Sequence, residues 1–91
     1  MDNFKPGLYR HYHGGLYTAI CLVTHHETRK PMVLYVSHTY GGLNVRPLHG
    51  WLGDVDGWDD LVKVDDQHVR RFQFIGDLPS DIPVVDRDSI P

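Results

Sequence analysis

Residues 8–26 read LYRHYHGGLYTAICLVTHH, in which two runs rich in tyrosine and aliphatic residues flank the pair Gly14-Gly15. Tyrosine, valine, isoleucine and leucine suit a pleated sheet, and glycine reaches the positive φ angles of a tight hairpin without a steric penalty. The stretch therefore predicts a strand over residues 8–13, a hairpin turn at Gly14-Gly15 and a longer strand over residues 16–26.

A second hairpin signal follows, because HTYGGL at residues 38–43 resembles HYHGGL at residues 11–16. It predicts a strand over residues 32–40, a turn at Gly41-Gly42 and a fourth strand over residues 43–46. The likeness indicates one kind of hairpin used twice, and not a repeat architecture.

The strand predicted over residues 16–26 is apolar on both faces. A sheet open to water on one side would show cleaner alternation of apolar and polar residues. The pattern predicts strands that bend through a small closed barrel, or a sheet face covered by a partner such as a second copy of the chain. In strict alternation one face carries Leu16, Ile20 and Leu22, and the other carries Tyr17, Ala19, Cys21 and Val23.

The pattern is weaker beyond Pro47. Residues 48–55 predict a short helical turn followed by a strand, and Asp56-Gly57 is a good turn pair. Residues 59–66 are half of a hairpin around that turn or a short helix, and their β-branched residues favour the hairpin. Residues 69–75 predict a final strand.

The composition indicates one folded domain. Of 91 residues, 41% are hydrophobic and 23% are charged, which is ordinary for a globular protein. We expect an all-β domain over residues 1–75, with little helix and about five to seven antiparallel strands, followed by an extended, partly disordered tail over residues 76–91.

The charge and the first residues bear on location and on partners. The net charge of −3 makes nucleic-acid binding an unfavoured alternative, because phosphate neutralisation needs a basic surface. No secretory signal is apparent, and no apolar run approaches the roughly 20 residues that span a bilayer. We expect a cytoplasmic protein that does not enter a membrane.

A metal site is one hypothesis for the histidines. On a strand, His11 and His13 project from the same face, at a spacing that lets both reach one zinc ion. His25 or Glu27 would be a third ligand only if the sheet curves strongly, because the hairpin places both beyond the start of the first strand. The alternative function is therefore a metal-dependent or acid–base enzyme that uses His11, His13 and Glu27. The simpler interpretation, solvated or hydrogen-bonded histidines with no metal or other cofactor, is preferred.

The sequence matches neither a calcium-binding EF-hand loop nor a reactive cysteine site. An EF-hand loop that started at Asp54 would have glycine at the fourth position and not at the sixth. Cys21 is the only cysteine and has apolar neighbours, so an inert buried thiol is expected.

Planar and basic side chains remain, and such groups suit recognition of peptides, planar ligands or anions. In a small barrel, however, most tyrosines pack their rings in the core and hydrogen-bond locally. The set comprises His11, Tyr12, Tyr35, Tyr40, Arg46, Trp51, Arg71 and Phe72.

The order of several short motifs resembles domain-of-unknown-function family 1653, a family of small bacterial proteins. The match covers about residues 7–75, and the resemblance implies an SH3-like barrel and no established activity. The motifs are Gly7-x-Tyr9-x-His11-Tyr12-x-Gly14-Gly15-x-Tyr17, His25-x-Glu27-Thr28, Pro31-x-Val33-x-Tyr35, Tyr40-Gly41, Val45-Arg46-Pro47-Leu48 and Arg71-Phe72.

The chain departs from the family pattern in three places. Asn44 replaces an aromatic residue, His49-Gly50-Trp51 replaces an acidic-Met-Phe run, and extra residues lie between Val55 and Arg70. At position 13 the family more often has lysine, which weakens a role for His13.

These motif positions lie at strand ends and hairpins, where small barrels commonly bind. The favoured function is a non-enzymatic binding module for a peptide, a protein partner or a small anionic ligand. Its candidate binding residues are His11, Tyr12, Glu27, Tyr35, Arg46 and Arg71.

Overall fold

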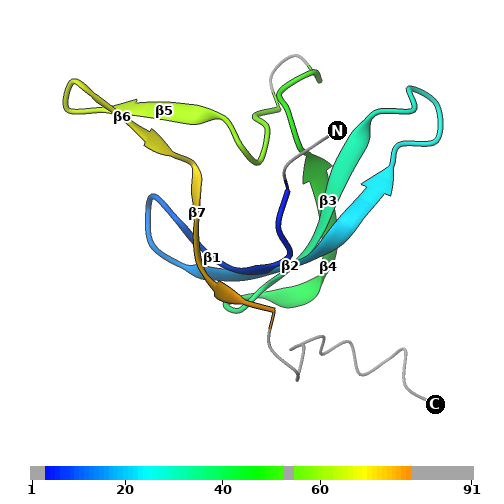
Figure 1. Ribbon diagram of the computed structural model, residues 1–91, viewed down its shortest axis with the longest axis horizontal. Coiled ribbons are helices and arrows are strands. Elements are labelled where there is room, and N and C mark those ends of the chain that lie inside the picture. The colour runs from blue at the N-terminus through cyan, green and yellow to red at the C-terminus, as the bar shows by residue number, and fades with distance from the viewer. Residues whose placement is uncertain (1–3, 53–54, 79–91) are drawn as a thin grey trace.

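The computed structural model describes residues 4–52 and 55–78, and this part of the chain forms seven strands and no helix (Figure 1). The predicted all-β class is confirmed, and the number of strands is within the expected range. The strands are β1 (Gly7–His11), β2 (Leu16–Thr24), β3 (Pro31–Ser37), β4 (Gly41–Pro47), β5 (Leu61–Val64), β6 (Gln67–Arg70) and β7 (Phe72–Asp77).

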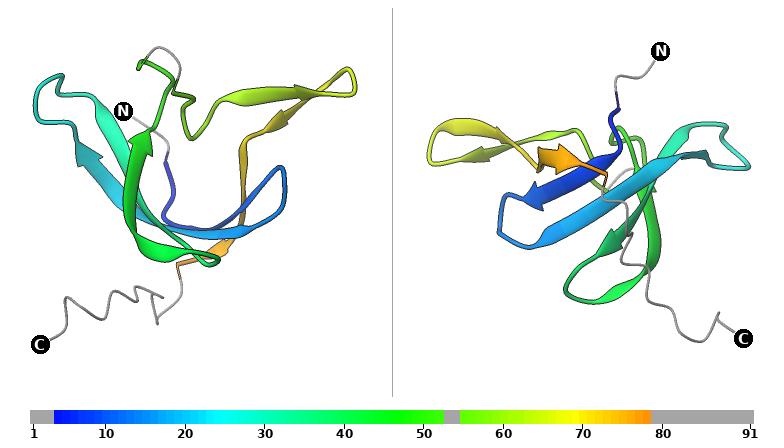
Figure 2. Two further views of the ribbon diagram at one scale, coloured as in Figure 1. Left: turned by 180° about the vertical axis from the view of Figure 1, so that it is seen from behind. Right: turned by 60° about the horizontal axis from the view of Figure 1, so that its bottom comes forward.

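Five strands form one antiparallel sheet in the order β4-β3-β2-β1-β7, and β5 pairs with β6 in a separate ribbon. The five-stranded sheet is strongly curved, and the β5–β6 ribbon projects beside the β1–β2 hairpin (Figures 1 and 2). In the described residues β4 and β7 are the edges of this sheet. An SH3-like barrel stays a prediction at this level of detail.

The first hairpin forms at the predicted glycines, but its loop is longer than two residues. Gly14 and Gly15 have φ angles of 99° and 84°. The amide of Gly14 donates to the His11 carbonyl at 2.7 Å, and the amide of His11 donates to the Gly15 carbonyl at 3.1 Å. Tyr12 and His13 therefore belong to the loop, and β1 ends at His11 instead of continuing to residue 13.

The second hairpin also turns earlier than predicted. Gly41 and Gly42 have positive φ angles, yet Gly41 already pairs with Ser37, so the turn comprises residues 38–40. The Ser37 hydroxyl accepts hydrogen bonds from the amides of Thr39 and Tyr40, each at 3.2 Å. A side chain that competes for these amides ends the strand at Ser37.

A β-bulge changes the predicted faces of β2. The register shifts between Ala19 and Cys21, so Ile20 is the extra residue. Tyr17, Ala19 and Leu22 consequently all pack toward the core, whereas strict alternation had placed Leu22 on the opposite face.

The region after Pro47 differs most from the prediction. The described residues of this region contain no helical turn; Leu52 and Val55 form only an isolated bridge. The hairpin turns at Asp65-Asp66 and not at Asp56-Gly57. The predicted strand over residues 69–75 divides at Arg71, because the amide of Arg71 donates to Asp60 at 3.0 Å and its carbonyl accepts from Tyr12 at 2.9 Å.

The β5–β6 turn is a position where a substitution should stabilise the chain. Asp65 and Asp66 both have positive φ angles, 49° and 68°, as a type I′ turn requires. The double change Asp65→Asn with Asp66→Gly should raise the free energy of unfolding by about 1 kcal/mol, because glycine avoids the Cβ penalty of this conformation. Urea unfolding would measure it. The single change Asp65→Asn serves as control, and an equal gain from it alone would contradict the backbone explanation.

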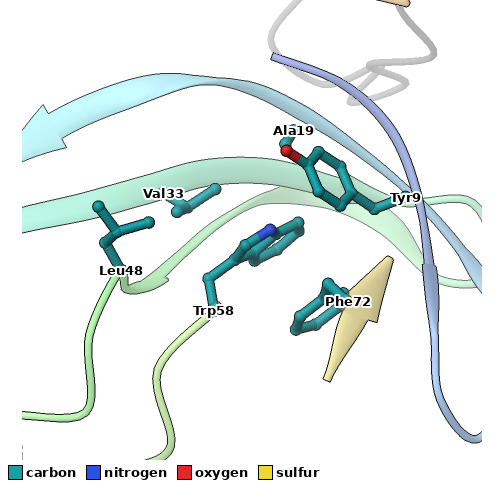
Figure 3. Packing of buried hydrophobic residues seen from close by; sticks show 6 residues of the cluster. All are labelled: Tyr9, Ala19, Val33, Leu48, Trp58 and Phe72. Atoms are coloured by element: carbon teal, nitrogen blue, oxygen red, sulfur yellow. The ribbon is translucent and has the colours of Figure 1, made fainter. Parts of the chain in front are cut away.

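The core lies on the inner face of the curved sheet. Trp58 has 2% of its surface exposed and contacts the rings of Tyr9, Tyr35 and Phe72. Figure 3 shows its indole between Leu48 and Val33 on one side and Phe72 on the other. The buried cluster consists of Tyr9, Ala19, Val33, Leu48, Trp58 and Phe72.

The segment that carries Trp58 also joins the two edges of the sheet. The amides of Trp58 and Asp59 donate to the carbonyls of Pro47 and Leu48, at the end of β4, at 2.7 and 3.0 Å. The carbonyl of Asp60 accepts from Arg71, immediately before β7. Residues 58–60 thus close the sheet where β4 and β7 do not pair with each other in the described chain.

Two further expectations concern the C-terminal residues and membranes. Gly76 and Asp77, the first residues of the expected tail, pair with β1 as the end of β7; residues 79–91 lie outside the described residues. Within the described part of the chain, no helix is long and apolar enough to cross a membrane.

Candidate functional site

The candidate site lies where the β1–β2 hairpin meets the start of β7 (Figure 1). His11 is opposite Phe72 in the register, so the two side chains share the inner face of the sheet, with ring centroids 4.9 Å apart. The amide of Tyr12 donates to the Arg71 carbonyl at 2.9 Å. Three of the predicted binding residues, His11, Tyr12 and Arg71, are therefore neighbours.

Arg46 reaches the same place from β4. It pairs with the core residue Val33, which puts its side chain on the inner face, and its guanidinium carbon lies 5.4 Å from the Phe72 ring centroid. Its Nε donates to the main-chain carbonyl of Asp56 at 3.3 Å. Its other N–H groups have no acceptor among the described residues. Much of the hydrogen-bonding capacity of Arg46 is thus unused.

Arg71 is the more buried of the two arginines. Its side chain is 13% exposed, its Nη2 lies 3.0 Å from Asp56 Oδ2, and its guanidinium lies 5.8 Å from the Tyr12 ring centroid. The Nε of Arg71 is buried and has no hydrogen-bond partner in the described chain. One residue, Asp56, therefore faces two guanidinium groups.

Two tyrosines extend this surface. The ring centroids of Tyr17 and Tyr35 are 5.8 Å apart, and Tyr17 also contacts Phe72. Neither hydroxyl has a hydrogen-bond partner among the described residues. Burial raises the pKa of Tyr35, and the positive charge of Arg46 opposes that rise only in part. The Tyr35 hydroxyl is therefore protonated at neutral pH and can donate a hydrogen bond.

These residues combine cationic groups and hydroxyl donors on an aromatic floor. Such a set suits a carboxylate or phosphate, because guanidinium groups bind planar oxyanions through paired hydrogen bonds. The arginine cluster is defined here as His11, Tyr12, Tyr17, Tyr35, Arg46, Asp56 and Arg71.

The electrostatics of His11 reflect its position in this cluster. Its pKa is lowered, first by burial and then by the positive charges of His13, Arg46 and Arg71. The Asp56 carboxylate lies against Arg71 and offsets only part of this positive field. His11 is therefore mainly neutral at pH 7, and a bound anion would favour its protonated form.

This lowered pKa predicts a loss of stability in mild acid. The unfolded chain protonates His11 more readily than the folded chain does, so the stabilisation is complete above the ordinary histidine pKa and is lost as pH falls through the lowered one. Urea midpoints between pH 7.5 and 5 should fall less steeply for His11→Gln than for the wild type. His26→Gln, at an exposed histidine, is the control. Equal slopes for all three proteins would contradict the prediction.

Glu27 does not join the cluster. It lies in the β2–β3 turn, at the opposite end of the nine-residue strand β2 from the β1–β2 hairpin. Nine strand residues span about 27 Å, so Glu27 and His11 cannot share a small ligand. His13 lies near His11, with ring centroids 5.5 Å apart, but it is exposed in the loop. The described residues contain no group of three or more His, Cys, Asp or Glu placed to hold a metal ion.

Two open hollows flank the buried rings. One of about 620 Å³ lies between the β1–β2 and β5–β6 hairpins, and its basic lining residues are Arg10, His11, His13 and Arg70. Another, of about 760 Å³, is lined mainly by core rings. Its Lys5 pairs with Asp77 and its Asp59 with His49, whereas Arg70, which lines both hollows, has no acidic partner among the described residues. The smaller hollow shares His11 and Tyr12 with the arginine cluster.

The sequence comparisons agree with this picture of a small β domain that carries the recognised motifs. The family described as "Protein of unknown function (DUF1653)" matches residues 7–74. The chain belongs to the DUF1653 family. A search of curated proteins gave no match.

A solved structure supports the same assignment for this DUF1653 chain. The chain is similar to the crystal structure of a DUF1653 protein from Bordetella bronchiseptica, with a TM-score of 0.68 and 28% identity. The match covers 87% of this chain and 96% of the other.

Sequence reasoning missed two members of the cluster in this DUF1653 chain, Tyr17 and Asp56. Tyr17 pairs with Tyr9 in the observed register and so shares the inner face, whereas a two-residue turn at Gly14-Gly15 would pair Tyr17 with Tyr12. For Asp56 the sequence predicts only a turn with Gly57. Nothing local shows that it contacts Arg71, fifteen residues further along, because residues 58–60 have to cross the sheet edges first.

Proposed function

We propose that this DUF1653 domain is a non-enzymatic binding module whose arginine cluster holds the anionic group of a peptide, a protein partner or a small molecule. The observation that carries the proposal is the number of donors without partners at one place. Arg46 has free N–H groups, Arg71 has a buried Nε without an acceptor, and the Tyr35 hydroxyl is unpaired among the described residues. Of these donors only the Arg71 Nε is fully buried, whereas the half-buried Arg46 and Tyr35 can present theirs to an anion that approaches from solvent.

The aromatic rings packed against Arg46 favour the binding of an anion over a salt bridge that is exposed to solvent. Phe72 lies beneath Arg46 and stacks on Trp58, with ring centroids 3.8 Å apart. Ring surfaces exclude water from one side of the guanidinium, which strengthens its attraction for an anion. The role of each residue follows: Arg46 and Arg71 bind the charge, Tyr35 donates a hydroxyl, and His11 gains a proton on binding.

Titration of the labelled protein with inorganic phosphate and with acetate tests this function. Amide and side-chain NMR signals of the arginine cluster should shift in a saturable way. Arg46→Gln should weaken binding about tenfold, the equivalent of one charge-assisted hydrogen bond. Arg29→Gln removes the same charge from the exposed β2–β3 turn and is the matched control.

Tyr35→Phe gives a second, milder variant. Its lost hydroxyl has no partner among the described residues, so stability should stay close to that of the wild type while anion affinity falls severalfold. Shifts that are spread evenly over the surface, or equal losses for Arg46→Gln and Arg29→Gln, would refute the proposed site.

Self-association through an apolar strand face stays a prediction. On β4, Leu43 and Val45 are 52% and 49% exposed. Sedimentation equilibrium of the wild type and of Val45→Lys would test it.

A further inference from the structure

Both arginines of the cluster contact the same residue, Asp56. Arg71 Nη2 lies 3.0 Å from the Asp56 carboxylate, while Arg46 Nε donates to the main-chain carbonyl of the same residue at 3.3 Å. The two arginines thus divide between them a side-chain carboxylate and a peptide carbonyl. If the Asp56 side chain turns away, Arg71 is open to another carboxylate, while the main-chain carbonyl of Asp56 stays with Arg46.

Asp56 is placed so that another carboxylate can replace it. Its side chain is 58% exposed, although that of Arg71 is only 13% exposed. The buried anchor of this segment is Trp58, two residues further along, and the amide of Gly57 bonds to Asp60 at 2.8 Å. Displacement of the Asp56 carboxylate therefore leaves the core contacts of the segment in place.

A second basic surface continues from the cluster. The hollow between the β1–β2 and β5–β6 hairpins is lined by Arg10 and Arg70 as well as by His11 and His13, and no aspartate or glutamate of the described chain is among its lining residues. Arg10 and Arg70 have no acidic partner among the described residues. In a chain of net charge −3, this concentration of positive charge is local.

We propose that the ligand is an acidic peptide segment of a partner protein, one of whose carboxylates replaces that of Asp56 at Arg71 while its neighbouring acidic residues enter the hollow beside Arg10 and Arg70. The inference rests on the proposed function and adds its ligand class. Asp56 then acts as an internal competitor that lowers the affinity for weakly acidic segments. Nucleic acid is the competing occupant; a long polyphosphate would extend beyond the local basic surface and meet the net negative charge of the rest of the chain, whereas a short acidic segment would not.

The test uses the full chain and five probes. They are a blocked hexapeptide with three Asp or Glu residues, its Asn/Gln counterpart, acetate, inorganic phosphate and a single-stranded DNA hexamer, each titrated by NMR or calorimetry. The acidic peptide should bind at least about tenfold more tightly than its neutral counterpart, since each well-placed charge pair contributes about that factor.

Variants separate the two basic surfaces. Asp56→Asn should increase affinity for the acidic peptide severalfold. Asp77→Asn, which removes an equal charge at the other end of β7, should not. Arg10→Gln with Arg70→Gln should weaken peptide binding at least about fivefold and leave the shifts caused by acetate in place. Both arginines are exposed, so this double variant decides the question even if Asp56→Asn unfolds.

The outcomes distinguish the inference from the proposed function. If acetate or phosphate shifts the cluster but the acidic and neutral peptides bind equally, the inference fails and the anion site stands. Preference for the DNA hexamer over the acidic peptide would also overturn the inference. If no probe shifts the cluster, both are wrong.

Discussion

Replacing Trp58 by alanine is expected to lower the free energy of unfolding by about 3–5 kcal/mol, the usual range for a buried aromatic residue. Trp58 is 2% exposed and stacks on Phe72 with ring planes 5° apart. It also reaches Tyr9 and Tyr35, which come from two different strands. Its removal therefore leaves a cavity on the inner face of the curved sheet, where rings from three strands meet.

Trp58→Phe is the control for this prediction. The indole N–H is buried without a hydrogen-bond partner among the described residues, and phenylalanine keeps a ring while removing that group. Its loss should be less than half that of Trp58→Ala, because part of the lost packing is offset by the absence of an unsatisfied donor. Guanidinium unfolding followed by far-UV circular dichroism measures both. Losses of similar size in the two variants would show that the indole shape, and not the ring stack, stabilises the fold.

Gly57→Ala should lower the free energy of unfolding by about 3 kcal/mol, the upper end of the range for overpacking. A Cβ at position 57 would lie 2.4 Å from the Gly50 amide nitrogen and 2.5 Å from the carbonyl carbon of His49. Both are main-chain atoms, so no side-chain rotation relieves the clash. The segment on either side would have to shift, and this moves Trp58 out of the core and Asp56 away from Arg71.

The matched control is Gly42→Ala. Gly42 has a φ of 75°, but a Cβ there has nothing within 4 Å. Gly42→Ala should lower the free energy of unfolding by about 1 kcal/mol, which is the conformational penalty alone. Thermal unfolding of both variants, with phosphate titration of Gly57→Ala, checks the link between the segment and the site. A Gly57→Ala protein as stable as Gly42→Ala would contradict the packing described here.

The strands of the meander were predictable because their signals are local. Segments rich in tyrosine and β-branched residues are separated by pairs of glycines. Those glycines do take the positive φ angles that hairpins need. The details that failed are those where a side chain or an extra residue competes with the pattern. The Ser37 hydroxyl ends β3 by accepting hydrogen bonds from two backbone amides. The bulge at Ile20 moves Leu22 to the inner face.

Part of the candidate site was also predictable. The sequence order alone selected His11, Tyr12, Tyr35, Arg46 and Arg71, because they belong to the motifs that resemble the family. It also selected Glu27 on the same ground. Spacing in a motif says nothing about distance in space, and the length of β2 separates Glu27 from the others.

By itself the sequence determined an all-β chain, its first hairpins and its family, since propensity, turn residues and motif order depend on neighbours in the chain. The tertiary structure alone decided the role of residues 55–72. Trp58 enters a core built by strands that come before and after it, and Asp56 meets Arg71 only once residues 58–60 have joined the sheet edges. These contacts join residues that are distant in sequence, and their free energy exists only when the whole sheet has curved around the ring.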